Sequence, residues 1–177
     1  MASYYYLVAT LPMLKYEDSA PFSCDEFLRL CKSNVNKNDY KIITEALSGN
    51  TASYKFVKNW HQFDTNVKKE LAEQRSKKLN RKGDKYNNTN YKEFRIVEGV
   101  RAALAAKNAY EGELLLMKLC WKYLDEESTN HVFDLEGLLA FSIKLKLLER
   151  KSRFDKVEGN KEFKSLLNNL QSTMKSN

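Results

Sequence analysis

Residues 131–150 read HVFDLEGLLAFSIKLKLLER, and their apolar side chains fall on nearly every side of a helix. An ordinary surface helix has one apolar stripe and one polar face. On a helical wheel at about 100° per residue, the following residues lie almost all the way round: Leu135, Leu138, Leu139, Phe141, Ile143, Leu145, Leu147 and Leu148. The pattern predicts a helix that is covered on several sides. Its cover is either the rest of the fold or another protein.

The remainder of the chain also favours helices. Both prolines, Pro12 and Pro21, lie near the N-terminus, so the long stretch that follows has no residue that would break a helix in this way. Glycines are few as well, six in 177 residues. We therefore predict an all-α fold, a compact bundle of about six to eight helices.

The N-terminal segment 4–11, YYYLVATL, is the one ambiguous element. Tyrosine, valine and threonine favour strands, yet a short apolar run also fits a buried helix. Helix is slightly favoured, because no partner strand is evident elsewhere in the chain.

The length fits one domain of common size. We expect a single helical domain over 1–177, or two helical halves, 1–83 and 93–177. A polar, asparagine-rich segment at 84–92 would join these halves as a mobile hinge.

Several polar residues are placed to start helices by accepting a hydrogen bond from a backbone amide. Ser23 with Glu26 forms a capping-box pattern, and Asn108 with Glu111 forms another. Asp134 can cap the opening stretch, whose helix should run to about 154. The alternative at Asn108 is one continuous helix that runs to Leu124.

Other boundaries follow from glycine and threonine. A helix over about 39–48 should end at Gly49, and Thr51 can cap a longer helix that reaches about 81. The pattern resumes at Phe94, and a last amphipathic helix is predicted around 163–170.

Residues 113–124 carry two competing apolar stripes. One stripe ends in a charge and contains Leu115, Leu119 and Lys122. The other stripe is apolar throughout, so we expect this stripe to pack against the rest of the protein. It contains Leu114, Met117, Trp121 and Leu124.

No catalytic motif is evident in the chain. It lacks the glycine-rich phosphate loop, GxSxG, HExxH and CxxC patterns, so we expect neither an enzyme nor a bound cofactor. His61 and His131 have no cysteine or acidic partner at ligand spacing, and we expect no metal site. Three cysteines, an odd and sparse set, fit a reducing compartment.

Two groups of residues are candidates for partner contact. The segment RSKKLNRKGDK at 75–85 has a single acidic residue, and its six cations are Arg75, Lys77, Lys78, Arg81, Lys82 and Lys85. They could meet phosphate or an acidic protein surface, or simply be the solvated C-terminus of a helix, which we favour. Tyr4, Tyr5 and Tyr6 cannot all face inward, so at least one should be exposed or at an interface.

Three stretches together resemble a family of otherwise uncharacterised bacterial proteins encoded among V-type ATPase genes. They are YYYLVATLPML at 4–14 with PFSCDEFLRLC at 21–31, NAYEGELLLMKLCWKYLDE at 108–126, and FDLEGLLAFSIKLKLLER at 133–150. In that family the gene lies where related operons carry the central-stalk rotor protein, which is named C in archaea and d in eukaryotes. Many members have proline where this chain has Ala109, and the chain is short beside that rotor protein.

The resemblance implies a non-catalytic central-stalk component that couples the shaft of the catalytic head to the membrane ring of a rotary, proton- or ion-transporting ATPase. Its partners would be other ATPase subunits, with no small-molecule substrate. It would be cytoplasmic and peripheral at the inner face of the cell membrane, held there through the complex. The alternatives are an ATPase assembly factor and a basic helical nucleic-acid-binding protein, the latter less expected.

Overall fold

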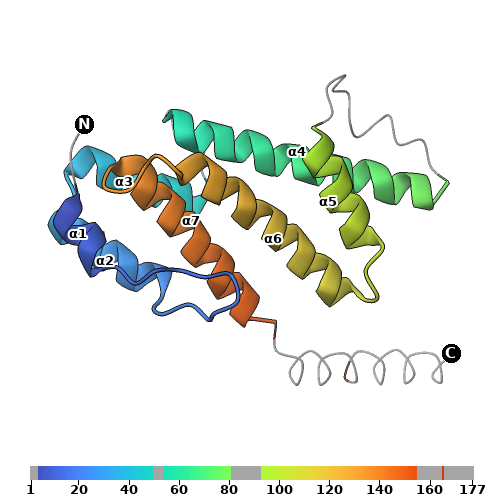
Figure 1. Ribbon diagram of the computed structural model, residues 1–177, viewed down its shortest axis with the longest axis horizontal. Coiled ribbons are helices and arrows are strands. Elements are labelled where there is room, and N and C mark those ends of the chain that lie inside the picture. Colours follow the sequence, from blue (N-terminus) through green and yellow to red (C-terminus); the bar gives the residue numbers. More distant parts are fainter. Residues whose placement is uncertain (1–3, 50–53, 81–92, 155–164, 166–177) are drawn as a thin grey trace, which may run out of the picture.

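The computed structural model describes residues 4–49, 54–80, 93–154 and 165. These residues contain seven helices and no strand, which confirms the predicted all-α bundle (Figure 1). The helices are α1 (Tyr5–Thr10), α2 (Cys24–Asn34), α3 (Lys37–Ser48), α4 (Lys55–Lys78), α5 (Phe94–Leu104), α6 (Ala109–Ser128) and α7 (Leu135–Ser152).

Three of the predicted helix starts are confirmed. The side-chain oxygen of Ser23 accepts a hydrogen bond from the backbone N–H of Glu26 at 3.1 Å, and Asn108 accepts one from Glu111 at 2.8 Å. Asp134 caps α7 through the N–H of Gly137 at 3.0 Å. Each bond satisfies an amide that the helix itself leaves without a partner. The cap at Asn108 also excludes one continuous helix to Leu124.

The predicted start of α4 is wrong. The helix begins at Lys55 with Tyr54 at its N-cap position, and no side-chain cap bond forms there. The Tyr54 hydroxyl instead donates a hydrogen bond to Glu136 at 2.5 Å, so this residue fastens the start of α4 to α7. Thr51 lies outside the described residues. Gly49 ends α3 with a left-handed φ of 82°, as predicted.

The N-terminal segment is helical, as slightly favoured. It is held to the α6–α7 turn by the backbone N–H of Tyr4, which donates to the carbonyl of Phe133 at 2.7 Å. This bond satisfies an amide at the helix start that the helix itself leaves without a partner, and Leu7 is buried against the rest of the core.

The opening stretch forms α7, and the protein's own helices cover it. Helices α2, α3, α4 and α6 all pack against α7 (Figure 1). Leu138, Leu139 and Leu145 are fully buried. Removal of this apolar surface from water is the main stabilising term for the bundle. The sequence left open whether the rest of the fold or another protein covers this helix. In the structure, the protein's own helices cover it.

The core is shared by residues from both sides of the 84–92 segment. It runs from Tyr4 in the N-terminal part to Leu145 in α7, and α4 packs directly on α5. The predicted hinge at 84–92 and the predicted last helix lie outside the described residues, apart from position 165.

The choice between the two stripes of α6 is confirmed. Met117, Trp121 and Leu124 are buried, whereas Leu115 and Lys122 are exposed. Phe94, where the apolar pattern of the chain resumes, is 78% exposed in the first turn of α5, so it does not contribute to the core. Within the described residues, every helix is too short or too polar to span a bilayer.

Candidate partner-binding surfaces

The three N-terminal tyrosines divide between the core and the surface. Tyr4 is buried, and its hydroxyl donates a hydrogen bond to Asp39 at 2.5 Å while it accepts one from the Asn36 amide at 2.7 Å. Burial, and then the bond to Asp39, raise the pKa of Tyr4 to about 12. Tyr5 is exposed and Tyr6 is 86% exposed, which confirms that at least one of the three faces outward.

The exposed tyrosines belong to a larger apolar surface, called the aromatic patch: Tyr5, Tyr6, Val132 and Phe133. The ring of Tyr5 lies 5.0 Å from that of Phe133 and 5.7 Å from that of Tyr6, measured between centroids. Phe133 is 41% exposed although it is a large apolar residue. Val132 and Phe133 were not among the residues predicted for partner contact, although the sequence carries a signal for them: two apolar residues inside a polar turn, directly before a helix cap.

A cluster of His131, Asp134 and Glu136 lies beside this patch, at the start of α7. The prediction that His131 has no acidic partner is wrong, because its Nδ1 atom lies 2.6 Å from Asp134. The hydrogen bond to Asp134 raises the pKa of His131.

The ligand atoms of these three residues come within 4.8 Å of one another, so they are the described residues that could hold a metal ion. However, Asp134 also accepts from Gly137, and Glu136 accepts from Tyr54. Both carboxylates are therefore engaged in fastening the start of α7, and the arrangement is best explained as a helix cap.

Three of the six predicted basic residues are described, and they lie in the last turns of α4. Lys77 forms an ion pair with Glu73 at 2.6 Å. Lys78 donates from its ammonium group to the carbonyl oxygen of Leu104 at 2.7 Å, at the C-terminus of α5. A cation is stabilised at a helix C-terminus by the helix dipole. Arg81, Lys82 and Lys85 lie outside the described residues.

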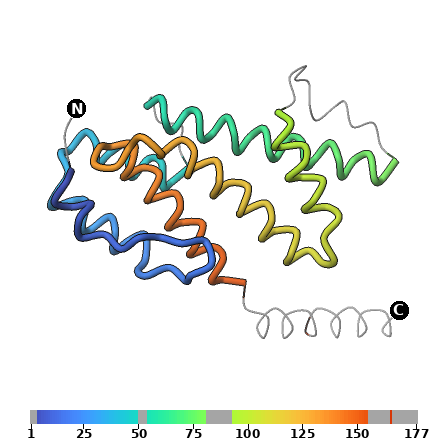
Figure 2. Tube along the Cα trace, viewed as in Figure 1, coloured from blue at the N-terminus to red at the C-terminus, as the bar shows by residue number. Residues whose placement is uncertain are grey.

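The described residues of the two predicted surfaces lie at opposite ends of an elongated molecule. Helix α1 and the α6–α7 turn form one end, and the C-terminus of α4 forms the other (Figures 1 and 2). Helix α4 alone has 24 residues and is about 36 Å long at 1.5 Å per residue. The structure therefore separates the groups that the sequence presented as candidates and does not combine them into one site.

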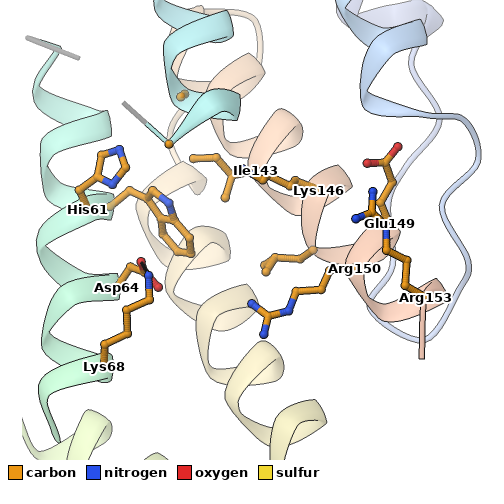
Figure 3. Close-up of a pocket in the computed structure, with 12 residues that line it drawn as sticks. His61, Asp64, Lys68, Ile143, Lys146, Glu149, Arg150 and Arg153 are labelled. Carbon is orange, nitrogen blue, oxygen red and sulfur yellow. Dashed lines mark hydrogen bonds and ion pairs between the residues drawn. The ribbon is translucent and has the colours of Figure 1, made fainter. Parts of the chain in front are cut away.

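A hollow of about 420 Å³ lies between α4 and α7 (Figure 3). Its charged side chains are largely satisfied by the protein. Lys68 pairs with Asp64 at 2.5 Å, and Arg150 pairs with Glu113. Glu149 accepts a hydrogen bond from the backbone N–H of Cys24 at 2.7 Å, at the start of α2. These contacts join helices, and they leave few groups free for a ligand.

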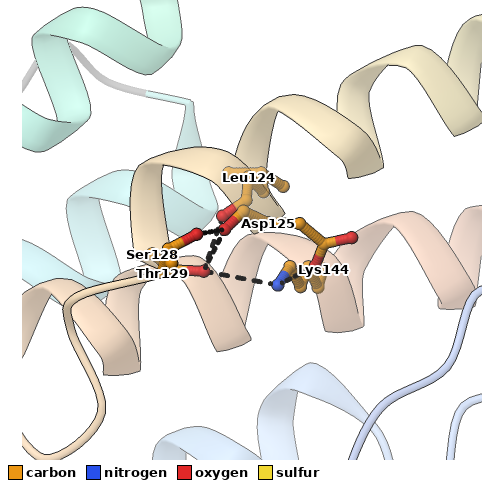
Figure 4. Close-up of polar contacts among 5 residues, drawn as sticks. All are labelled: Leu124, Asp125, Ser128, Thr129 and Lys144. Carbon is orange, nitrogen blue, oxygen red and sulfur yellow. Dashed lines mark hydrogen bonds and ion pairs between the residues drawn. The ribbon is translucent and has the colours of Figure 1, made fainter.

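Lys144 on α7 also joins two helices through an ion pair, in this case α7 and α6. Its side chain is largely buried, and its ammonium group lies 2.6 Å from the Asp125 carboxylate of α6 (Figure 4). The same nitrogen lies 3.5 Å from the Ser128 hydroxyl and over the ring of Trp121. A buried ammonium with a carboxylate, a hydroxyl and an aromatic face has its polar requirements met within the fold.

The cysteines offer no reactive thiol. All three are free, Cys31 and Cys120 are buried, and burial raises the pKa of each of these two thiols to about 12. At neutral pH they remain protonated, and the protonated thiol is a poor nucleophile.

Comparisons with other proteins extend over the second part of the chain. Residues 87–174, a little under half of the sequence, match a family described as a protein of unknown function (DUF2764). The match contains the whole of α5, α6 and α7. No curated protein and no solved structure matches the chain. Over these residues the protein is therefore similar to a family whose description assigns no activity.

Proposed function

We propose that this protein is a non-catalytic subunit of a V-type ATPase, a central-stalk component that couples the rotor shaft of the catalytic head to the membrane ring. The sequence resemblance supplies the identity of the complex. The structural support is one observation: two chemically different surfaces, one aromatic and one basic, lie at opposite ends of a single helical body.

A coupling component needs two contacts that are held at a fixed separation. Helices α4, α6 and α7 share one core, so a displacement at either end is transmitted through packed side chains. Protein cores are packed as densely as organic crystals and deform little under load. In this proposal the protein transmits torque mechanically and binds neither nucleotide nor metal.

The two ends would contribute differently to assembly. Exposed aromatic side chains typically supply much of the binding energy of an interface. Cations instead accelerate association with an acidic surface. The proposed peripheral location at the inner face of the membrane follows from attachment to the ring.

The test is a pull-down of the tagged full-length protein from native membranes in mild detergent, with quantification of the bound proteins by mass spectrometry. Stoichiometric recovery of both the catalytic head and the membrane ring is the expected result. Substoichiometric recovery of head proteins without the ring would instead identify an assembly factor. Recovery of nucleic acid or ribosomal proteins, with neither part of the ATPase, would contradict the proposal and favour the basic nucleic-acid-binding alternative.

A further inference from the structure

The second apolar stripe of α6 is only partly covered by the rest of the fold. Leu115 is 40% exposed and Leu119 is half-buried, while the other stripe of the same helix fills the core. Exposed leucine on an otherwise well-packed helix is ordinary when isolated. Here, however, the two leucines line a common groove with residues of α5.

This groove, of about 410 Å³, lies between α5 and α6 and is called the α5–α6 groove. On the α5 side it is lined by two small residues, Gly99 and Ala102, and by Arg95. A Cβ atom at Gly99 would lie only 2.8 Å from the side chain of Leu119, so glycine permits the close approach of the two helices. The result is a shallow floor of small and apolar side chains.

The rim of the groove carries positive charge that the described residues do not neutralise. Lys118 and Lys122 line the α6 side, and no described carboxylate forms an ion pair with either one. Lys118 lies 5.8 Å from the ring centroid of Tyr16. The acidic residue of the groove, Glu126, pairs with Arg95.

Arg95 is itself held in place by the core. Its guanidinium lies 5.3 Å from the ring centroid of Phe63 and 5.1 Å from that of Tyr123, and it also pairs with Glu93. Glu126 is therefore not available to Lys122. The α4–α7 hollow differs, because most of its cations already have partners.

We propose that the α5–α6 groove binds an amphipathic helix of a partner protein, one with acidic residues beside its apolar stripe. Helices dock in apolar grooves through residues spaced three and four apart, and small residues on the groove wall let them approach closely. The segment 115–126 spans about three helical turns, which is enough for such anchors. Carboxylates on the docked helix would meet Lys118 and Lys122. The groove is a site on the side of the body, separate from its two ends.

The first experiment maps what lies on the groove. A photo-cross-linking amino acid replaces Leu115 in the full-length protein, produced in its native cells, and the cross-linked peptide is sequenced. The expected product contains a helical apolar repeat flanked by aspartate or glutamate. A product with a second copy of this chain, with its own residues 155–177, or with a segment that lacks acidic residues would overturn the proposal, as would the absence of any product.

The second experiment tests the charge. Lys118→Glu with Lys122→Glu should lower the cross-link yield at Leu115 by about tenfold or more, because two attractions become repulsions. The control, Lys55→Glu with Lys58→Glu, makes the same change of net charge at exposed positions of α4 and should leave the yield unchanged. Circular dichroism verifies that both variants are folded. Equal losses in the two variants, or no loss in either, would contradict the assignment.

These outcomes are independent of the proposed ATPase role. Cross-linking to an acidic helix of a protein outside the ATPase would keep the groove assignment, and the pull-down alone would still decide the proposed function. Stoichiometric pull-down of the ATPase without a cross-link at Leu115 would support the proposed function and overturn the groove assignment.

Discussion

The aromatic end and the basic end of the molecule are held in different ways. At the aromatic end, Tyr6 and Phe133 place ring surface in solvent, and their neighbours within the patch are other rings. At the basic end, Lys77 and Lys78 are already bound to Glu73 and to the C-terminus of α5. Exposed ring surface is therefore available to a partner, whereas part of the positive charge already stabilises the fold.

The largest expected effect concerns the body that joins the two ends. Leu145→Ala removes a fully buried side chain from α7 and should lower the free energy of unfolding by about 2–5 kcal/mol. Urea denaturation measures this change. Leu79→Ala, at an exposed position next to the basic end, should change it by no more than about 0.5 kcal/mol. Similar values for the two variants would contradict the central place of α7.

The next largest effect is a loss of binding when exposed rings are removed from the aromatic end. Tyr6→Ala with Phe133→Ala should weaken reassembly with membranes stripped of the native protein by about tenfold or more, chiefly through faster dissociation. Stability should change little, because these side chains are exposed. Phe94→Ala removes an exposed ring of α5 and serves as the matched control. If the control weakens reassembly as much, the aromatic patch has no special role.

A smaller effect is expected at the basic end. Arg75→Glu should slow association several-fold at low ionic strength, and the effect should fade as salt is added, because exposed charges act mainly on the encounter rate. Stopped-flow or surface-binding kinetics would measure it, with Lys58→Glu as the control of equal charge. A change confined to the dissociation rate would contradict this division between the ends.

The smallest effect is a pH dependence beside the aromatic end. The pKa of His131 is raised in the folded protein, so its charged bond to Asp134 stabilises fully below the unfolded pKa of about 6.5. This contribution is lost as the pH rises through the higher folded pKa. Urea midpoints of the wild type should therefore fall more from acidic to mildly alkaline pH than those of His131→Gln. Parallel pH profiles would show that the bond contributes nothing measurable.

Local features of the fold were predictable from the sequence because their causes are local. Ser23, Asn108 and Asp134 cap helices through the backbone N–H three residues later, and a left-handed turn at Gly49 ends α3. The buried stripe of α6, which contains Met117, Trp121 and Leu124, could be identified from residue spacing and charge alone. The exposure of at least one N-terminal tyrosine followed from three neighbouring side chains that share one short segment.

Other features depend on contacts between distant residues. Tyr54 at the start of α4 is bonded to Glu136 of α7, and the Tyr4 amide at the start of α1 is bonded to Phe133. The pairing of His131 with Asp134 joins residues only three apart, but it forms because the turn before α7 brings the imidazole back onto the helix cap. The exposure of Phe94 likewise reflects how α5 lies on its neighbours, which a periodic pattern does not specify.

The helical class, most helix boundaries and the residue types that could contact a partner follow from the amino-acid sequence alone, because hydrophobic periodicity and capping act over a few residues. Tertiary packing is needed to explain why α7 is covered by its own fold and why Val132 and Phe133 lie beside the tyrosines. It also places the aromatic residues and the described basic residues at opposite ends. Those outcomes depend on which surfaces pack together, and packing selects among local patterns that are equally good in isolation.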